Sequence, residues 1–320
     1  MRLAALDLGS NSFHLLVADE LPGGRIRRVT TEKVTLRLGG LVARTGQLGK
    51  EARERALGAI AELLLHAKQA GATHIVTVAT DALRSASDSQ KLRRRIQDEH
   101  GLQIHVLAGE QEGALSLRGM AGVLALDPGE KILGLDLGGG SFEIGYGGRE
   151  GEVQVASLPI GGAKLADRLT GDPPRLAERV ELYLEILAIL RPVAERLADA
   201  KGSRAMGTAG TIRDLGRTGL ALAGGRAPAK IRGLVVTRDQ LERGYARLVS
   251  VPTLERMDLP GLRLGRADLL PAGGIVLLAT MEVFALEQLE LCDWGLREGV
   301  LLDVLGPQQV LSGDVVAPLR

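Results

Sequence analysis

The chain has 320 residues, more than one hydrophobic core usually fills, so its length predicts two domains. Apolar residues make up 45% of it and charged residues 25%, a balance that excludes extended disorder, and an aromatic content of 2% disfavours nucleic-acid binding by base stacking. A formal net charge of +1 excludes long-range attraction of a polyanion, so any anion must be bound by local groups.

The first part of the chain predicts alternating strands and helices. Short apolar runs bounded by turn residues indicate strands, and apolar residues at helical spacing indicate helices. The predicted strands are residues 3–8, 13–18, 34–38, 74–80 and 104–108. The predicted helices are residues 51–69, 88–99 and 111–123. This alternation is typical of an α/β domain.

The turn LDPGE at 126–130 ends this part, and we place the domain boundary there. The N-terminal domain is then 1–125 and the C-terminal domain 126–320. In the second domain, Thr237 and Gln240 form a capping-box pattern that opens a helix. Its other predicted elements are a helix over 174–200, a strand before Gly207, a helix after Gly210, a helix over the ADLLPAGGIVLLATMEVF segment, a strand near 289–292 and a final helix.

The start of each predicted domain carries a related sequence, ALDLGSNSFHLL at 5–16 and GLDLGGGSFEIG at 134–145. Each copy has an acid at the end of an apolar strand, then a glycine-rich turn and a Ser-Phe pair. The identical positions are Leu6, Asp7, Leu8, Gly9, Ser12 and Phe13, aligned with Leu135, Asp136, Leu137, Gly138, Ser141 and Phe142. The repeat favours a duplicated fold over two unrelated hairpins.

Both turns are candidates for anion binding. Glycine lets an anion approach closely, and successive backbone N–H groups in a tight turn form an anion nest. The hydroxyls of Ser12 and Ser141 can add hydrogen bonds, whereas Asp7 and Asp136 would repel phosphate unless a cation lies between. We therefore infer a divalent cation, and Mg²⁺ suits carboxylate and water ligands. The alternative is that both turns are ordinary hairpin turns.

Further motifs extend the pattern along the chain: VATDALRSASD, GEQEGALSL, SLPIGGAKL, GTAGTIRDL and RADLLPAGGIVLLATMEV. In order and spacing, these and the two repeats resemble the exopolyphosphatase/guanosine pentaphosphate phosphatase family, in its short two-domain form. That family belongs to the actin, sugar kinase and Hsp70 superfamily. The resemblance implies an α/β fold of two duplicated ribonuclease H-like (actin-like ATPase) domains with an interdomain cleft.

The resemblance also implies the activity and its residues. It implies an exopolyphosphatase that hydrolyses terminal phosphate from inorganic polyphosphate, with guanosine pentaphosphate as a second substrate, by Mg²⁺-assisted attack of water. It places the catalytic base on Glu112, with Asp136, Glu143 and Arg84 as further catalytic residues. The metal ligands are then Asp136, Glu143 and Asp7. The phosphate-binding residues are Gly9, Ser10, Asn11, Ser12, Gly138, Gly139, Gly140, Ser141, Thr208 and Gly210.

Structural roles remain open for several of these residues. Glu112 could serve only to stabilise the N-terminus of its helix, and Arg84 could form a surface salt bridge. Thr208 could belong to a plain capping loop, and Arg266 in the RAD motif is expected to be structural. Gln111 and Ala114 depart from the family pattern, which usually has Glu and Arg there.

A different class of function is a sensor that binds guanosine tetraphosphate or pentaphosphate with weak or no hydrolysis, and Gln111 favours it. The single cysteine, Cys292, leaves no internal disulfide and fits the reducing cytoplasm. No run of about 18 apolar residues occurs, so we expect a cytoplasmic protein without membrane contact. No nucleic-acid partner is expected, and the family suggests a homodimer.

Overall fold

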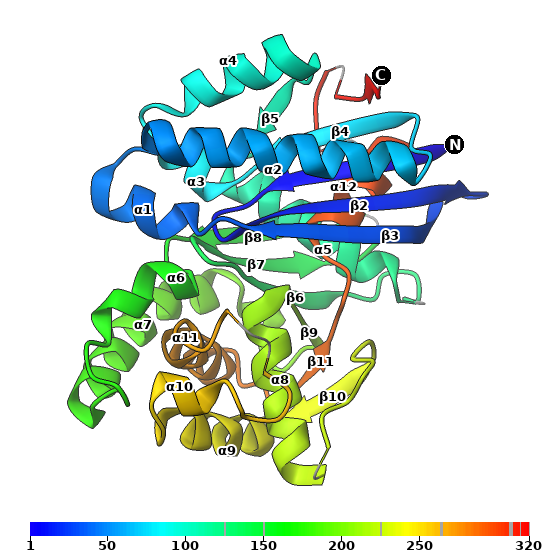
Figure 1. The fold of residues 1–320 in the computed structure, drawn as a ribbon. Coiled ribbons are helices and arrows are strands. Elements are labelled where there is room, and N and C mark those ends of the chain that lie inside the picture. The colour runs from blue at the N-terminus through cyan, green and yellow to red at the C-terminus, as the bar shows by residue number, and fades with distance from the viewer. Residues whose placement is uncertain are drawn as a thin grey trace. The chain divides into compact units, whose positions relative to one another are not determined.

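The computed structural model describes residues 1–124, 126–149, 151–224, 226–262, 265–306, 310–313 and 315–319. The chain divides into two compact units (Figure 1). The first unit is Met1–Ala125 together with Trp294–Arg320, and the second is Leu126–Asp293. We had expected the second domain to continue to residue 320, so that part of the boundary prediction is wrong. Position 125, where we placed the end of the first domain, lies outside the described residues.

The final segment joins the first unit because its polar and apolar groups find partners there. Helix α12 (Leu296–Leu305) packs against helix α5 (Gly109–Gly122) and the first sheet. The buried Asp303 forms an ion pair with Arg118, and the buried Glu298 accepts a hydrogen bond from Arg28 Nε at 2.8 Å. None of these partners could be assigned from local sequence, because each pair is far apart along the chain.

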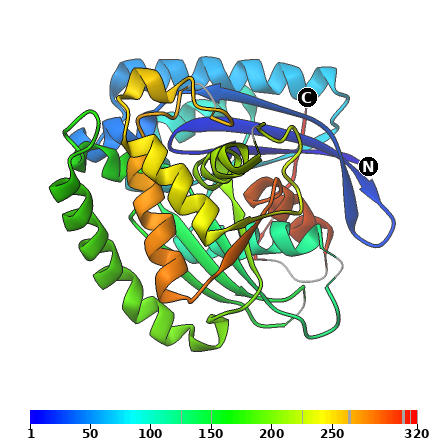
Figure 2. The same ribbon diagram turned by 90° about the horizontal axis from the view of Figure 1, so that it is seen from below.

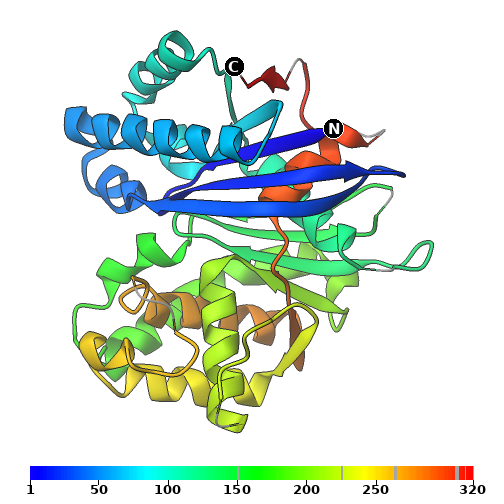
Figure 3. The same cartoon turned by 45° about the vertical axis from the view of Figure 1, so that its right-hand side comes forward.

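The sheet of the first unit begins with a meander of three antiparallel strands and continues with parallel pairing of β1 to β4 and of β4 to β5. Its strands are β1 (Arg2–Leu8), β2 (Ser12–Leu21), β3 (Arg25–Thr35), β4 (His74–Ala79), β5 (Ile104–Val106) and β12 (Ala317–Pro318). Its helices before α5 are α1 (Leu38–Thr45), α2 (Gly49–Gln69), α3 (Asp81–Ser85) and α4 (Ser89–His100). Helix α2 covers one face of the sheet and α12 the other (Figure 3).

Strand β3 lies earlier and is longer than the predicted strand at 34–38. In its sequence, RIRRVTTEKVT, charged residues and threonines separate the few apolar residues, and only Ile26 is buried. The strand is defined by its pairing with β2 along its whole length. It lies at the solvated edge of the sheet, so it does not need the apolar run by which strands are predicted from sequence.

The second unit repeats the same plan. Its strands are β6 (Ile132–Leu137), β7 (Phe142–Gly147), β8 (Gln154–Leu158), β9 (Ala205–Thr208), β10 (Leu234–Thr237) and β11 (Gln288–Leu291). Its helices are α6 (Gly162–Leu165), α7 (Leu176–Arg196), α8 (Ala209–Gly224), α9 (Arg238–Val249), α10 (Thr253–Arg256) and α11 (Leu270–Val283), with short 3-10 turns at Ala166–Arg168 and Ala198–Ala200. Helices α7 and α11 run side by side (Figure 2).

The order β3-β2-β1-β4-β5 in the first sheet corresponds to β8-β7-β6-β9-β11 in the second. In both sheets the first three strands are antiparallel and the next two are parallel to the first strand of the meander. The predicted α/β class and the duplicated ribonuclease H-like fold are therefore confirmed. The capping box is confirmed too: Thr237 Oγ1 accepts from the Gln240 N–H at 3.2 Å. Over the described ranges no helix combines the length and the apolar character that crossing a bilayer requires.

Candidate active site

The first glycine turn, Gly9 to Asn11, connects β1 to β2. Its carbonyl groups are taken by the chain that follows β3: Asn11 O accepts from Leu36 N at 3.0 Å and from Arg37 N at 2.9 Å, and Ser10 O accepts from Gly39 N at 2.8 Å. A side chain at Gly9 would place a Cβ 2.9 Å from Ser12 O, so the turn requires glycine there.

The second turn, Gly138 to Ser141, is held in the corresponding way by the start of α6. Gly138 O accepts from Gly162 N at 3.0 Å, and Gly139 O accepts from Ala163 N at 2.9 Å. Because the carbonyls of both turns are engaged, the N–H groups are the polar atoms left to a ligand. Among the described residues, no acceptor is hydrogen-bonded to the N–H groups of Ser10, Asn11, Gly139 or Gly140. Such N–H groups form an anion nest.

The serine hydroxyls of the first turn have partners within the first unit. Ser10 Oγ accepts from the Ala82 N–H at 3.1 Å, which ties the turn to helix α3. Ser12 Oγ lies 3.1 Å from Thr35 Oγ1 and is buried on β2. Ser10 can still donate its hydroxyl hydrogen to a phosphate, whereas Ser12 serves the β2–β3 pairing. In the second turn, Ser141 is buried at 4% exposure.

The acids that precede the two turns have different neighbours. Asp136 on β6 is directly opposite Glu143 on β7, whereas Asp7 on β1 is opposite His14 on β2. Glu143 is 2% exposed, and its Oε1 accepts from Ser157 Oγ at 2.9 Å. Like charges directly opposite each other on antiparallel strands are destabilising, and a bound cation removes that cost. The pair in the second unit therefore has the donor chemistry that a hard divalent cation requires.

This pair would need ligands from elsewhere to complete a cation's coordination. No group of three or more His, Cys, Asp or Glu residues able to hold a metal occurs in the described ranges. Mg²⁺ is commonly bound by one or two carboxylates, with water and substrate phosphate oxygens filling the remaining positions. The carboxylate pair of Asp136 and Glu143 fits that mode of binding.

Arg84 and Glu112 lie together in the first unit. Arg84 Nη1 donates to Glu112 Oε2 at 3.3 Å and to the Leu107 carbonyl at 2.7 Å. Asp81, one turn earlier on α3, lies 3.7 Å from Arg84 Nη2. The guanidinium is thus placed between two carboxylates, of which Glu112 is 8% exposed. The salt bridge considered as the alternative role of Arg84 is therefore present, but it is partly buried, with side-chain exposures of 29% for Arg84 and 11% for Glu112.

Gln111, which departs from the family pattern, has two structural contacts, and one of them requires an amide. Its Oε1 accepts from the Ala108 N–H at 2.9 Å and so caps the start of α5. Its Nε2 donates to the Val310 carbonyl at 3.4 Å, a contact that a carboxylate could not make. Gln111 therefore fixes the N-terminus of the helix that presents Glu112.

The GTAGT segment of the second unit forms the junction between β9 and α8. Ala209 there has φ 65°, a left-handed conformation that is uncommon for a residue with a Cβ. The buried Thr208 precedes it, and a Cβ on Gly210 would lie 1.9 Å from the Arg266 Cζ atom. Arg266 Nε is 3.9 Å from the buried Asp214. Gly210 is thus needed to admit this guanidinium.

The sequence prediction missed several residues that shape these groups. Asp81 was quoted within ATDALR but given no role, although its i,i+3 spacing from Arg84 on a helix could have indicated the pair. Ser157, the first residue of the SLPIGGAKL motif, was given no role, because β8 meets β7 only in the fold. Arg266 was expected to be structural, and nothing in the sequence connected it to Gly210.

The chain is similar in sequence to known proteins over almost its whole length. Exopolyphosphatase 1 of Mycobacterium bovis is 32% identical over 307 residues, covering 94% of this chain and 88% of that protein. Exopolyphosphatase 1 of Mycobacterium leprae is 31% identical over 304 residues, covering 94% of this chain and 89% of that protein.

Solved structures show the same fold over almost the whole chain. The crystal structure of an exopolyphosphatase from Cytophaga hutchinsonii has a TM-score of 0.88 at 26% identity and covers 98% of this chain and 100% of that one. A Ppx/GppA family member from Aquifex aeolicus has a TM-score of 0.78 at 29% identity, with coverage of 95% and 97%. The model of the Ppx/GppA phosphatase family matches residues 16–307, and the chain belongs to that family.

Proposed function

We propose that this phosphatase is an exopolyphosphatase, which releases the terminal phosphate of inorganic polyphosphate, with guanosine pentaphosphate as a second substrate. The observation that carries the proposal is the buried Glu112 carboxylate held by Arg84, in a chain related to exopolyphosphatases. A carboxylate in a fixed position can accept a proton from water, which is the step that hydrolysis of a phosphoanhydride requires.

In the proposed reaction Glu112 takes a proton from a water molecule as the water oxygen forms a bond to the terminal phosphorus. The bond from that phosphorus to the bridging oxygen breaks, and the shortened chain leaves with the bonding electrons. Arg84 orients the Glu112 carboxylate and adds positive charge near the oxygens of the transferring group. Water, and no sugar hydroxyl, is the acceptor.

The N–H groups of both glycine turns and of the GTAGT junction are proposed to bind phosphate oxygens. The turns contribute Ser10, Asn11, Gly139 and Gly140, whose N–H groups have no described acceptor. Thr208 ends β9 and Gly210 lies in the first turn of α8, where the helix N-terminus favours an anion. Gly9, Ser12, Gly138 and Ser141 give the turns their shape.

We infer that Mg²⁺ is the cofactor. When bound, it would neutralise phosphate charge and polarise the bond to phosphorus. Asp136 and Glu143 would hold it, together with phosphate oxygens and water, and Ser157 would fix the Glu143 carboxylate through its 2.9 Å hydrogen bond. Asp7, opposite His14 rather than a second acid, is proposed as a weaker contributor to metal binding. A cytoplasmic location and a homodimer remain predictions from the sequence.

The sensor hypothesis rests on Gln111, which stands where the family pattern usually has a second carboxylate. Gln111 was the reason to expect weak hydrolysis, and its side chain caps α5 through the Ala108 N–H. Because Gln111 is neutral and caps the helix, the Glu112 carboxylate remains the proposed base. We therefore propose hydrolysis, supported by the Glu112 carboxylate that Arg84 holds, with the sensor as the alternative.

The test is phosphate release from long-chain polyphosphate and, in parallel, from guanosine pentaphosphate, with Mg²⁺ and with excess chelator. We expect release with Mg²⁺ that is lost on chelation. Tight binding of guanosine pentaphosphate without release of phosphate from either substrate would instead support the sensor.

A further inference from the structure

The first unit contains a basic pocket that none of the proposed catalytic residues lines. We call it the α1–α2 pocket, because residues from Thr35 to Arg55 form it. Its volume is about 630 Å³, within the range of about 300–1,000 Å³ typical of small-molecule sites. Four cationic side chains and one carboxylate line it: Arg37, Arg44, Lys50, Arg55 and Glu51. This excess of positive charge favours an anionic ligand.

The cations are accessible from solvent. Arg37, Arg44, Lys50 and Arg55 are all exposed. Among the described residues Lys50 has no carboxylate partner, and Arg55 Nη2 donates to the Leu36 carbonyl at 3.1 Å rather than to an acid. An ammonium and a guanidinium placed in this way can donate further hydrogen bonds to phosphate oxygens.

Part of the pocket wall is hydrogen-bonded to the first glycine turn. Arg37 and its neighbour Leu36, both in the pocket wall, donate their N–H groups to Asn11 O of that turn. Arg37 has φ 55°, a left-handed conformation that carries strain in a non-glycine residue. Strain of this kind persists where the surrounding structure fixes it, and here the two hydrogen bonds to the turn do so.

Another part of the pocket wall is held by Ser87 and Asp88, the last two residues of the VATDALRSASD motif, which have no role in the proposed chemistry. Asp88 accepts from Leu48 N at 2.7 Å and from Gly49 N at 3.0 Å. Ser87 N donates to Gly46 O at 3.0 Å. The same motif supplies Ala82 to Ser10 of the turn and Arg84 to Glu112. One segment thus fixes the turn, the proposed base and the pocket wall together.

We propose that the α1–α2 pocket binds inner phosphates of the polyphosphate chain, beyond the terminal group held at the first turn. The proposal rests on the function proposed above. A chain with one negative charge or more per phosphate requires cations along its length, and the protein's net charge of +1 supplies no general attraction. Short substrates would not reach the pocket, so it would determine preference for chain length.

The test is the double variant Arg44→Gln/Lys50→Gln, assayed on long-chain polyphosphate and on tripolyphosphate at several salt concentrations. The matched control is Lys68→Gln/Arg94→Gln, which removes the same charge from exposed positions of α2 and α4 outside the pocket. We expect the ratio of kcat/KM for the long chain to that for tripolyphosphate to fall about tenfold in the pocket variant and less than twofold in the control. The dependence of the long-chain KM on salt should also weaken, since fewer counterions are released on binding.

A calorimetric titration of long-chain polyphosphate in the presence of chelator separates this proposal from the proposed function. If the wild type hydrolyses neither substrate, the function fails, while weaker chain binding in the pocket variant alone still supports the pocket. Equal loss on both substrates, or unchanged chain binding, overturns the proposal. So does a pocket variant that binds the inorganic chain normally but loses guanosine pentaphosphate, because the pocket would then belong to a nucleotide.

Discussion

The Arg84 guanidinium donates to the Glu112 carboxylate across 3.3 Å, from helix α3 to helix α5 of the first unit. The same nitrogen donates to the Leu107 carbonyl, just before α5 begins. Arg84 is therefore positioned by the backbone and in turn positions the acid. A water molecule beside Glu112 would meet a carboxylate with a fixed direction, which is a condition for efficient proton transfer.

Glu112→Gln should abolish most of the activity. The amide keeps the size of the side chain but cannot accept the proton, so we expect kcat to fall by about 10²–10⁴-fold, as is usual for loss of general base catalysis. Binding of polyphosphate should persist. Steady-state kinetics together with a binding titration would check both, and activity within about threefold of the wild type would contradict the assignment. Glu110→Gln, on the same first turn of α5, is the control.

Arg84→Lys should lower kcat while leaving the free energy of unfolding nearly unchanged. Lysine keeps the charge but has a single nitrogen, so it cannot donate to Glu112 and the Leu107 carbonyl on one side and face Asp81 on the other, as the two terminal guanidinium nitrogens do. We therefore expect about a tenfold loss of kcat. Urea unfolding should give a midpoint near that of the wild type. A variant with normal kcat and a lowered midpoint would show that Arg84 is only a structural residue.

Gly299→Ala should destabilise the first unit. A Cβ at this position of α12 would lie 1.8 Å from the Leu115 carbonyl oxygen of α5, so the two helices must separate. The expected loss is about 1–3 kcal/mol in the free energy of unfolding, as for other overpacked sites. Gly58→Ala on α2 is the matched control, since its Cβ meets no atom within 4 Å. That change should stabilise the protein by up to about 1 kcal/mol. Equal effects of both substitutions on urea unfolding would argue against the α5–α12 contact.

The repeated motif was sufficient to predict the duplicated fold, because an acid, a glycine turn and an apolar strand recur with the same local spacing. Strand β10 at Leu234–Thr237 and helix α1 at Leu38–Thr45 were not predicted, since only tertiary contacts define them. The return of residues 294–320 to the first unit depends on partners such as Arg28 and Arg118, which are distant in sequence.

Part of the candidate site could also be predicted from the sequence motifs. Motif resemblance named Arg84 and Glu112, but not that they are hydrogen-bonded. It also named Asp136 and Glu143, but not that they lie directly opposite each other on β6 and β7. The role of Ser157 could not be predicted, because its contact with Glu143 requires β8 to pair with β7.

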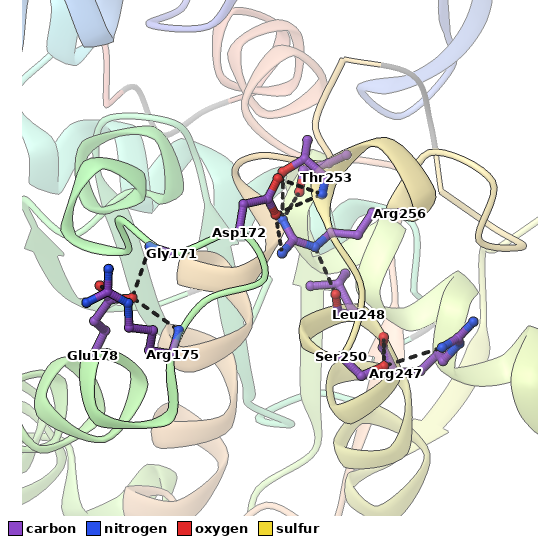
Figure 4. A network of polar contacts seen from close by, with 10 residues as sticks. Gly171, Asp172, Arg175, Glu178, Arg247, Leu248, Ser250, Thr253 and Arg256 are labelled. Atoms are coloured by element: carbon purple, nitrogen blue, oxygen red, sulfur yellow. Dashed lines mark hydrogen bonds and ion pairs between the residues drawn. The ribbon is translucent and has the colours of Figure 1, made fainter.

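Asp172→Ala should destabilise the second unit through Arg256. The Arg256 side chain is 2% exposed, and its Nη2 lies 3.2 Å from Asp172 Oδ1 (Figure 4). Asp172 also accepts from the Thr253 N–H at 2.8 Å. Removing the carboxylate leaves a buried cation whose remaining hydrogen bonds go to neutral oxygens, those of Leu248, Thr253 and Ala267. Burial already lowers the pKa of Arg256.

We expect a loss of about 1–3 kcal/mol in the free energy of unfolding, at the lower end because the Asp172 carboxylate is half exposed. Urea unfolding at neutral pH measures it. Asp172→Asn, which can still accept from Thr253, should lose less, and equal losses would show that the charge of Asp172 has no role.

Asp88→Asn should destabilise the first unit at neutral pH and much less in acid. Burial raises the pKa of Asp88, but the N–H groups of Leu48 and Gly49 and the Arg53 guanidinium outweigh it and hold the pKa below its ordinary value. A lowered pKa contributes stability above the unfolded value of about 3.9, and this contribution is lost as the pH falls through the folded pKa. The difference in unfolding free energy between wild type and variant should therefore be constant from pH 5 to 8, at about 1–3 kcal/mol. It should shrink as the pH falls below about 4. Urea unfolding across this range, with Asp98→Asn at an exposed position of α4 as the control, checks the sign, and a difference that grows in acid would contradict it.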